Sequence, residues 1–202
     1  MDMCELKVDH YKETCELLRE KIKERNRFFV LLWIDLFLLY LFLISRNETV
    51  SAIQGWMKEK LGIDSTFSPS VFLTLGWIFL LYFCMRYIQT NINIEREYIY
   101  VHKLELKIKV DGDNVFSREG DSYLDKYPCV LNYIDFLYKW FFPILFILAV
   151  ALRIILEIIA HVSFVGLVVD CVIAIAILIL WILHIAFIIS INKYYKTRSN
   201  SN

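Results

Sequence analysis

Four long apolar stretches constrain this chain more than any other feature, and they cover residues 28–44, about 71–87, 140–158 and 165–191. A helix needs about 20 mostly apolar residues to cross the hydrocarbon core, because that core is about 30 Å thick and each residue rises about 1.5 Å. Hydrophobic residues make up 58% of the chain, more than a soluble globular domain carries. The predicted fold class is therefore an all-α integral membrane protein with four transmembrane helices in two hairpins.

The polar sequence around these stretches divides the chain into five segments. Residues 1–27 are predicted to form a cytosolic amphipathic helix, and residues 28–88 the first transmembrane hairpin, with an interfacial loop at 45–70. A cytosolic helix and connection at 89–139 precede the second hairpin at 140–192, and a short basic tail covers 193–202. We expect the two cytosolic helices to pack against each other as a helical stalk.

Helical periodicity continues from the polar segments into the apolar ones. In residues 1–27, apolar side chains recur in steps of three and four, as in a coiled-coil seam: Val8, Tyr11, Cys15, Leu18 and Ile22. Neither proline nor glycine separates this seam from the first apolar stretch, so one continuous helix is expected. The second apolar stretch should also continue as a helix, to about Lys109, and Gly112 favours a stop there. Pro143 is expected to kink the third transmembrane helix.

The distribution of basic residues sets the expected orientation. Lys and Arg number seven in 1–27, seven in 89–139 and three in the tail, against three in 45–70 and none in 159–164. Because cytoplasmic loops carry the excess of these residues, both termini are predicted to be cytoplasmic, in a multi-pass protein of the inner (plasma) membrane. Segment 89–139 carries nine acidic residues against seven basic ones, so no direct contact with nucleic acid is expected.

Five ionisable residues fall inside the apolar stretches: Asp35, Arg153, Glu157, Asp170 and His184. Such residues are expensive in a bilayer and are candidates for function. Asp35 and His184 lie at matching depths near the cytoplasmic side and are predicted to form a carboxylate–imidazole pair. Arg153 and Glu157 are four residues apart on one helix face, and with Asp170 they are predicted to form an ion-paired cluster in the outer leaflet. Three interpretations stay open: a lock on helix packing, a proton or ion path, and interfacial snorkelling.

A second candidate site is a small polar pocket in segment 89–139, on the cytosolic side. Its predicted members are Arg96, His102, Glu105, Arg118, Glu119 and Tyr127. The alternative is that the connection simply packs on the helical stalk.

The spacing Arg96-x5-His102 resembles the Arg-x4-6-His motif of HEPN ribonucleases. That resemblance implies a membrane-tethered ribonuclease in which His102 is the general acid/base and Arg96 stabilises the developing phosphorane. On a continuous helix, however, six residues turn the side chain by about 600°, so the two residues project from different faces.

Motifs for other chemistry are missing from the sequence. The five cysteines include no CxxC pair and have no neighbouring histidine, and the Asp111-x-Asp113 stretch lacks the glycine of a calcium loop. All six glycines are isolated, so no phosphate-binding loop is present. We therefore predict no catalytic residues, no cofactor and no metal site.

The layout over most of the chain resembles small multi-span membrane effectors and accessory proteins of bacterial antiviral defence loci. Among these, the accessory membrane protein of RNA-targeting (type VI) CRISPR systems is the nearest in plan. The likeness rests on the charged N-terminal helix, the four apolar stretches, HKLE at His102–Glu105, and REGxxYxxxYP at Arg118–Pro128. It implies a membrane protein that acts in antiviral defence.

The leading functional prediction is a non-enzymatic membrane effector or accessory subunit that alters membrane permeability or recruits a cytosolic partner. Its expected partners are the lipid bilayer and either further copies of the chain or a cytosolic protein, bound through residues 8–22 and 94–108. One alternative is a small ion or proton channel or transporter that uses Asp35 and His184. The other is the ribonuclease-like enzyme with Arg96 and His102.

Overall fold

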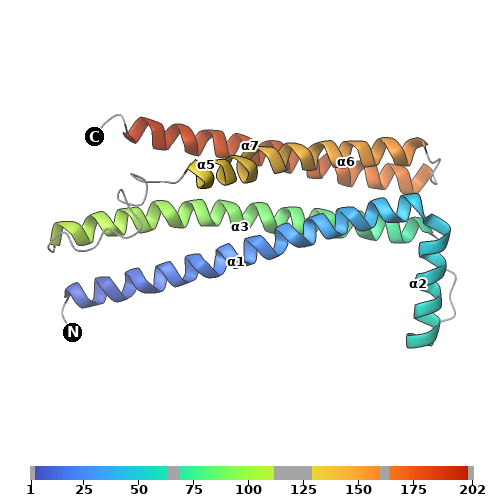
Figure 1. The fold of residues 1–202 in the computed structure, drawn as a ribbon, viewed down its shortest axis with the longest axis horizontal. Coiled ribbons are helices and arrows are strands. Elements are labelled where there is room, and N and C mark those ends of the chain that lie inside the picture. The colour runs from blue at the N-terminus through green and yellow to red at the C-terminus, as the bar shows by residue number, and fades with distance from the viewer. Residues whose placement is uncertain (1–2, 63–68, 112–128, 160–163, 200–202) are drawn as a thin grey trace. The chain divides into compact units, whose positions relative to one another are not determined.

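The computed structural model describes residues 3–62, 69–111, 129–159 and 164–199, and these residues are helical almost throughout (Figure 1). The order is α1 (Met3–Ile44), α2 (Arg46–Leu61), α3 (Pro69–Asp111), α5 (Cys129–Phe136), a π-helix η1 (Leu137–Phe141), α6 (Phe142–Ile159) and α7 (Phe164–Ser199). Four helical segments in these described ranges are long and apolar enough to cross a membrane: Leu6–Ile44, Val71–Glu105, Leu137–Ile159 and Phe164–Ile191. The all-helical fold and the four apolar helices are as predicted.

Helix α1 runs without a break from the charged N-terminal segment through the first apolar stretch, as its lack of proline and glycine predicted. It is blue to cyan in Figure 1. Helix α3 is likewise continuous from the second apolar stretch into the polar middle of the chain, and it ends at Asp111, directly before Gly112. The predicted stop at Gly112 lies outside the described residues.

The loop predicted at 45–70 contains helix α2. The last turn of α2 is capped by Gly62, whose φ of 67° is a left-handed conformation that glycine adopts at little cost. The Gly62 N–H donates to the Lys58 carbonyl at 3.2 Å, which satisfies one of the carbonyls left open at the helix end. Val50 is buried and Trp56 is exposed. The interfacial position of α2 stays a prediction.

A π-helix precedes α6 near the predicted kink. Pro143 has no N–H to donate to the carbonyl four residues earlier, that of Lys139, and in a regular α-helix its ring would clash with that carbonyl. The wider turns of η1, from Leu137 to Phe141, end just before this proline and accommodate it. The proline therefore changes the winding of the helix at this position.

Helix α7 extends to Ser199 and so includes most of the predicted basic tail, residues 193–202. No proline or glycine follows Gly166 in the chain, so nothing in the covalent structure stops the helix at residue 193.

The chain divides into two compact units. Unit 1 combines Met1–Phe28 with Arg86–Tyr138, and unit 2 combines Phe29–Met85 with Lys139–Asn202. Unit 1 thus consists mainly of the segments expected to form the stalk, and unit 2 contains most of the apolar stretches.

In unit 2 the buried side chains recur every three or four residues on each long helix, and α6 and α7 pack side by side (Figure 1). This spacing is typical of helices that pack nearly parallel or antiparallel. The outward positions carry large hydrophobic side chains: Phe37, Leu148, Val172 and Ile182 are each more than 60% exposed. An outer surface of this kind suits contact with lipid rather than water.

Candidate functional site

Polar residues interrupt the buried stripes of α6 and α7. On α6 the stripe reads Phe146, Val150, Arg153 and Glu157, and on α7 it reads Asp170, Ala174, Ile177, Trp181, His184 and Ile188. Every one of these residues is buried, although an apolar side chain occupies most of the equivalent positions. The helical register therefore places four ionisable residues inside unit 2, where water is excluded.

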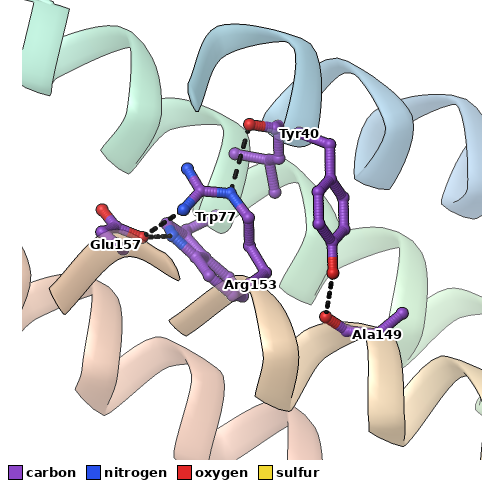
Figure 2. A network of polar contacts seen from close by, with 6 residues as sticks. Tyr40, Trp77, Ala149, Arg153 and Glu157 are labelled. Carbon is purple, nitrogen blue, oxygen red and sulfur yellow. Dashed lines mark hydrogen bonds and ion pairs between the residues drawn. The ribbon is translucent and has the colours of Figure 1, made fainter. Parts of the chain in front are cut away.

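Arg153 is the centre of the first cluster, and it is completely buried. Figure 2 shows its guanidinium between α1 and the carboxylate of Glu157. Nη1 donates to Oε2 of Glu157 at 2.9 Å, and Nε donates to the main-chain carbonyl of Leu39 at 3.2 Å. The predicted pairing of Arg153 with Glu157 is thus present, and a carbonyl of α1 adds a contact that the sequence could not indicate.

Two aromatic residues donate hydrogen bonds at or near this ion pair. Trp77 of α3 donates its indole N–H to the same Glu157 oxygen at 3.3 Å (Figure 2). Tyr40 of α1 donates its hydroxyl to the Ala149 carbonyl of α6 at 2.6 Å. Gly76 lies beside Trp77 in the chain, and a Cβ there would lie 2.7 Å from Cδ2 of Leu39. The absence of a side chain at Gly76 therefore permits the close approach of α1 and α3 at this level.

Asp170 of α7 lies beside this pair, but within the described residues no ion pair joins its carboxylate to Arg153, and the outer-leaflet position stays a prediction. Asp170 is 2% exposed, and its polar neighbours are Glu157, Thr74 and Arg153. The Thr74 hydroxyl approaches the Asp170 carboxylate, but among the described residues no donor reaches either of its oxygens in good hydrogen-bond geometry. Oε1 of Glu157 likewise lacks a donor there, and Nη2 of Arg153 lacks an acceptor. Burying such atoms unsatisfied costs several kcal/mol in an apolar environment. Ion pairing within the cluster is consequently incomplete.

The charges of the cluster do not cancel. One guanidinium faces two carboxylates, so full ionisation leaves one negative charge among Arg153, Glu157 and Asp170. A buried charge without compensation is strongly unfavourable, and more so within a bilayer. A cluster of this composition is suited to bind one further positive charge.

A second polar group in unit 2 surrounds Cys84, which is fully buried on α3. The indole of Trp181 and the carboxylate of Asp35 both lie near the Cys84 thiol. The ring of His184 packs edge-on against Trp181, with 5.8 Å between the ring centroids. Asp35 and His184 therefore both lie in the neighbourhood of Trp181 and Cys84. Their direct pairing stays a prediction.

The predicted cytosolic pocket falls partly outside the described residues, which include neither Arg118, Glu119 nor Tyr127. On α3, Arg96 is exposed and His102 is half-buried. Glu105 is buried, and its Oε1 accepts a hydrogen bond of 2.8 Å from Tyr11 of α1. Glu105 thus serves the contact between α1 and α3 in unit 1.

Within unit 1, the same two helices meet through several further contacts. Lys21 pairs with Glu97 at 2.7 Å, and Arg86 pairs with Glu24 at 2.7 Å. His10 Nε2 and the Tyr100 hydroxyl are 2.9 Å apart. The buried residues between the helices include Leu18, Ile94 and Val101. The segments 8–22 and 94–108, which were expected to bind a partner, therefore contact each other within one chain.

Sequence reasoning missed Trp77, Thr74 and Tyr40. Trp77 and Thr74 stand near the buried stripe of α3, and Tyr40 follows Leu39 of α1, so helical spacing alone would have placed them near the core. Their roles as polar neighbours of the cluster depend on how the helices pack, which spacing does not specify.

No protein-family model matches this chain, and neither a curated protein nor a solved structure matches it.

Proposed function

We propose that this protein is a non-enzymatic, multi-pass membrane protein that alters the permeability of its membrane to protons. Its distribution of Lys and Arg favours cytoplasmic termini and the inner (plasma) membrane. The observation that carries the proposal is the buried Arg153–Glu157–Asp170 cluster with its excess carboxylate. Buried ionisable groups of this kind are the parts from which proton relays in membranes are made.

The main competing explanation is that the cluster only locks the helices together. A lock works best when its charges cancel and its hydrogen bonds are complete. Here one carboxylate is in excess, and four polar atoms of the cluster lack a hydrogen-bond partner among the described residues. These features favour a site that gains and loses a charge over one that is only structural.

A proton suits the interior of unit 2 better than a large solute does. The stripes around the polar residues consist of bulky side chains such as Leu80, Phe146 and Ile177, all at most 1% exposed. Protons can pass along side chains and transient water, whereas a hydrated solute needs an open channel. The Asp35–Cys84–Trp181–His184 group supplies further polar side chains in the same unit.

The seam of residues 8–22 no longer requires a partner to cover its apolar side chains. The prediction of a partner arose because an apolar seam on a cytosolic helix needs a cover, and α3 provides one in unit 1. We propose self-assembly or binding of a cytosolic partner for the exposed faces of the helices instead. The antiviral role implied by the resemblance also stays a proposal, and its Arg118–Pro128 stretch lies outside the described residues.

Proton permeation is measured with the purified full-length chain in liposomes that contain a pH-sensitive dye. With valinomycin and a potassium gradient to drive it, we expect faster acidification than in protein-free liposomes, while entrapped calcein is retained. Acidification at the protein-free rate would contradict the proposal. Release of calcein would contradict a proton-selective path and favour an assembled pore.

The ribonuclease alternative is tested separately. Incubation of the protein with RNA should give no cleavage that depends on Arg96 and His102. Cleavage that is lost in the Arg96→Ala, His102→Ala double variant would contradict the non-enzymatic proposal.

A further inference from the structure

The Arg153–Glu157–Asp170 cluster contains donors and acceptors that its own side chains cannot match. Arg153 uses Nε for the Leu39 carbonyl and Nη1 for Glu157, and Oε2 of Glu157 also accepts from Trp77. These three donors thus converge on one carboxylate oxygen and one carbonyl, while Nη2 of Arg153 has no acceptor among the described residues. Oε1 of Glu157 and both oxygens of Asp170 remain as buried acceptors without a donor from the described residues.

Every helix that packs on the cluster contributes a polar or ionisable group. Helix α1 contributes the Leu39 carbonyl and Tyr40, α3 contributes Thr74 and Trp77, and α6 contributes Arg153 and Glu157. Helix α7 contributes Asp170 and, next to it, the Cys171 thiol. Arg153 is the cationic residue among these described groups, so within them the two carboxylates share a single counter-charge.

A proton corrects both the excess negative charge of the cluster and its shortage of hydrogen-bond donors. Bound to one of the two neighbouring carboxylates, it cancels the excess negative charge and supplies an O–H donor for an oxygen of the other. A metal cation is a poorer match, because it would need several oxygen ligands beside a guanidinium. In the described ranges, moreover, no three His, Cys, Asp or Glu side chains gather in a way that could hold one.

We propose that Glu157 and Asp170 together bind one proton in the interior of unit 2, with Arg153 as their fixed counter-charge. One carboxyl then carries the O–H and the other stays ionised against Arg153, so the cluster is neutral. The proposal rests on the proposed function for its role in transport. Proton binding itself can be measured without any flux, so the two proposals can fail separately.

Infrared spectroscopy of the full-length chain in detergent at neutral pH tests this directly, because a protonated carboxyl has its own C=O stretching band. We expect that band in the difference spectrum between wild type and Asp170→Asn, and also between wild type and Glu157→Gln. Either substitution removes one of the two carboxyls and lets the other ionise against Arg153. A protonated Asp35 would give the same band in wild type and in each variant, so its band would cancel in the difference spectra.

The substitution Arg153→Met should act in the opposite direction. Without the counter-charge both carboxyls take up protons, so the carboxyl band should grow rather than disappear. A purely structural role for Arg153 would not predict this gain.

The proposal is wrong if neither difference spectrum contains a carboxyl band, since both groups are then ionised in the wild type. A band lost in only one of the two variants contradicts sharing, because the proton then belongs to a single residue. A spectrum that changes with sodium concentration at fixed pH would assign the site to a metal cation instead. If Glu157→Gln does not fold, Asp170→Asn and Arg153→Met still give opposite expected changes.

Discussion

The buried stripes of α6 and α7 continue as apolar residues next to the cluster of Arg153, Glu157 and Asp170. Val150 lies one turn before Arg153, and Ala174 lies one turn after Asp170. The side chains of the cluster cannot turn outward, because the register of α6 and α7 directs these positions into unit 2. Once buried, each charge depends on the others for compensation. The effect of one of these residues on the free energy of unfolding therefore depends on whether the other two are present.

Removal of Arg153 tests this dependence. Arg153→Met removes the counter-charge, so the two buried carboxyls must take up protons to stay neutral. We expect the cost of that protonation at neutral pH, together with the lost ion pair, to lower the free energy of unfolding by about 3–5 kcal/mol. The triple variant Arg153→Met, Glu157→Leu, Asp170→Leu removes the whole cluster and should recover most of that loss. Thermal unfolding in detergent measures both. Equal loss in the single and triple variants would show that the charges do not compensate one another.

Gly76 gives a second prediction at this scale, with Gly55 as its matched control. A Cβ at Gly76 would lie 2.7 Å from the buried Leu39 side chain, whereas nothing lies within 4 Å of a Cβ at Gly55. Gly76→Ala should destabilise the protein by about 1–3 kcal/mol through overpacking. Gly55→Ala, inside α2, should stabilise that helix by up to about 1 kcal/mol. Melting temperatures that rise for both variants would contradict the close approach at Gly76.

At the scale of the element, α1 and α3 each combine a polar and an apolar half in a single unbroken helix. In unit 1 their polar halves are held by exposed or half-exposed ion pairs and by the buried seam. Exposed ion pairs contribute only about 0–1 kcal/mol each, so most of the stabilisation must come from apolar contacts such as that of Leu18. The seam therefore determines how tightly the two helices associate.

Adjacent leucines allow a matched test of the seam. Leu18 is 2% exposed and Leu17 is 55% exposed, although they are neighbours on α1. Leu18→Ala should destabilise the α1–α3 contact by about 2–5 kcal/mol, while Leu17→Ala should change it by less than about 0.5 kcal/mol. Hydrogen exchange of residues 6–28 and 86–105 measures the effect. Similar exchange in both variants would mean that the seam is not covered by α3.

For the molecule as a whole, the sequence alone predicted the helical class, the four apolar helices and the continuity of α1 and α3. These features follow from local patterns of hydrophobicity and from the placement of proline and glycine. The pairing of Arg153 with Glu157 was also predictable, because it joins residues four apart on one helix. The contact between the N-terminal part of α1 and the polar part of α3 was also expected. The Trp77 contact and the contact with the Leu39 carbonyl were not predictable, because they depend on how the helices pack.

The extension of α7 to Ser199 shows the limit of composition as a guide. The change from apolar to basic residues near Lys193 suggested a boundary, but helix formation depends on the backbone, and no helix-breaking residue stands there. Composition indicates where a helix could leave an apolar environment. It does not indicate where the helix ends.

The central claim is that protons pass through the buried cluster of unit 2, and proton flux into proteoliposomes tests it most directly. The comparison includes wild type, Asp170→Asn and the control Glu59→Gln, whose carboxylate side chain is 73% exposed on α2. We predict that flux in Asp170→Asn falls to the rate of protein-free liposomes, while Glu59→Gln behaves as wild type. Wild-type flux in Asp170→Asn, at equal protein incorporation, would contradict the account.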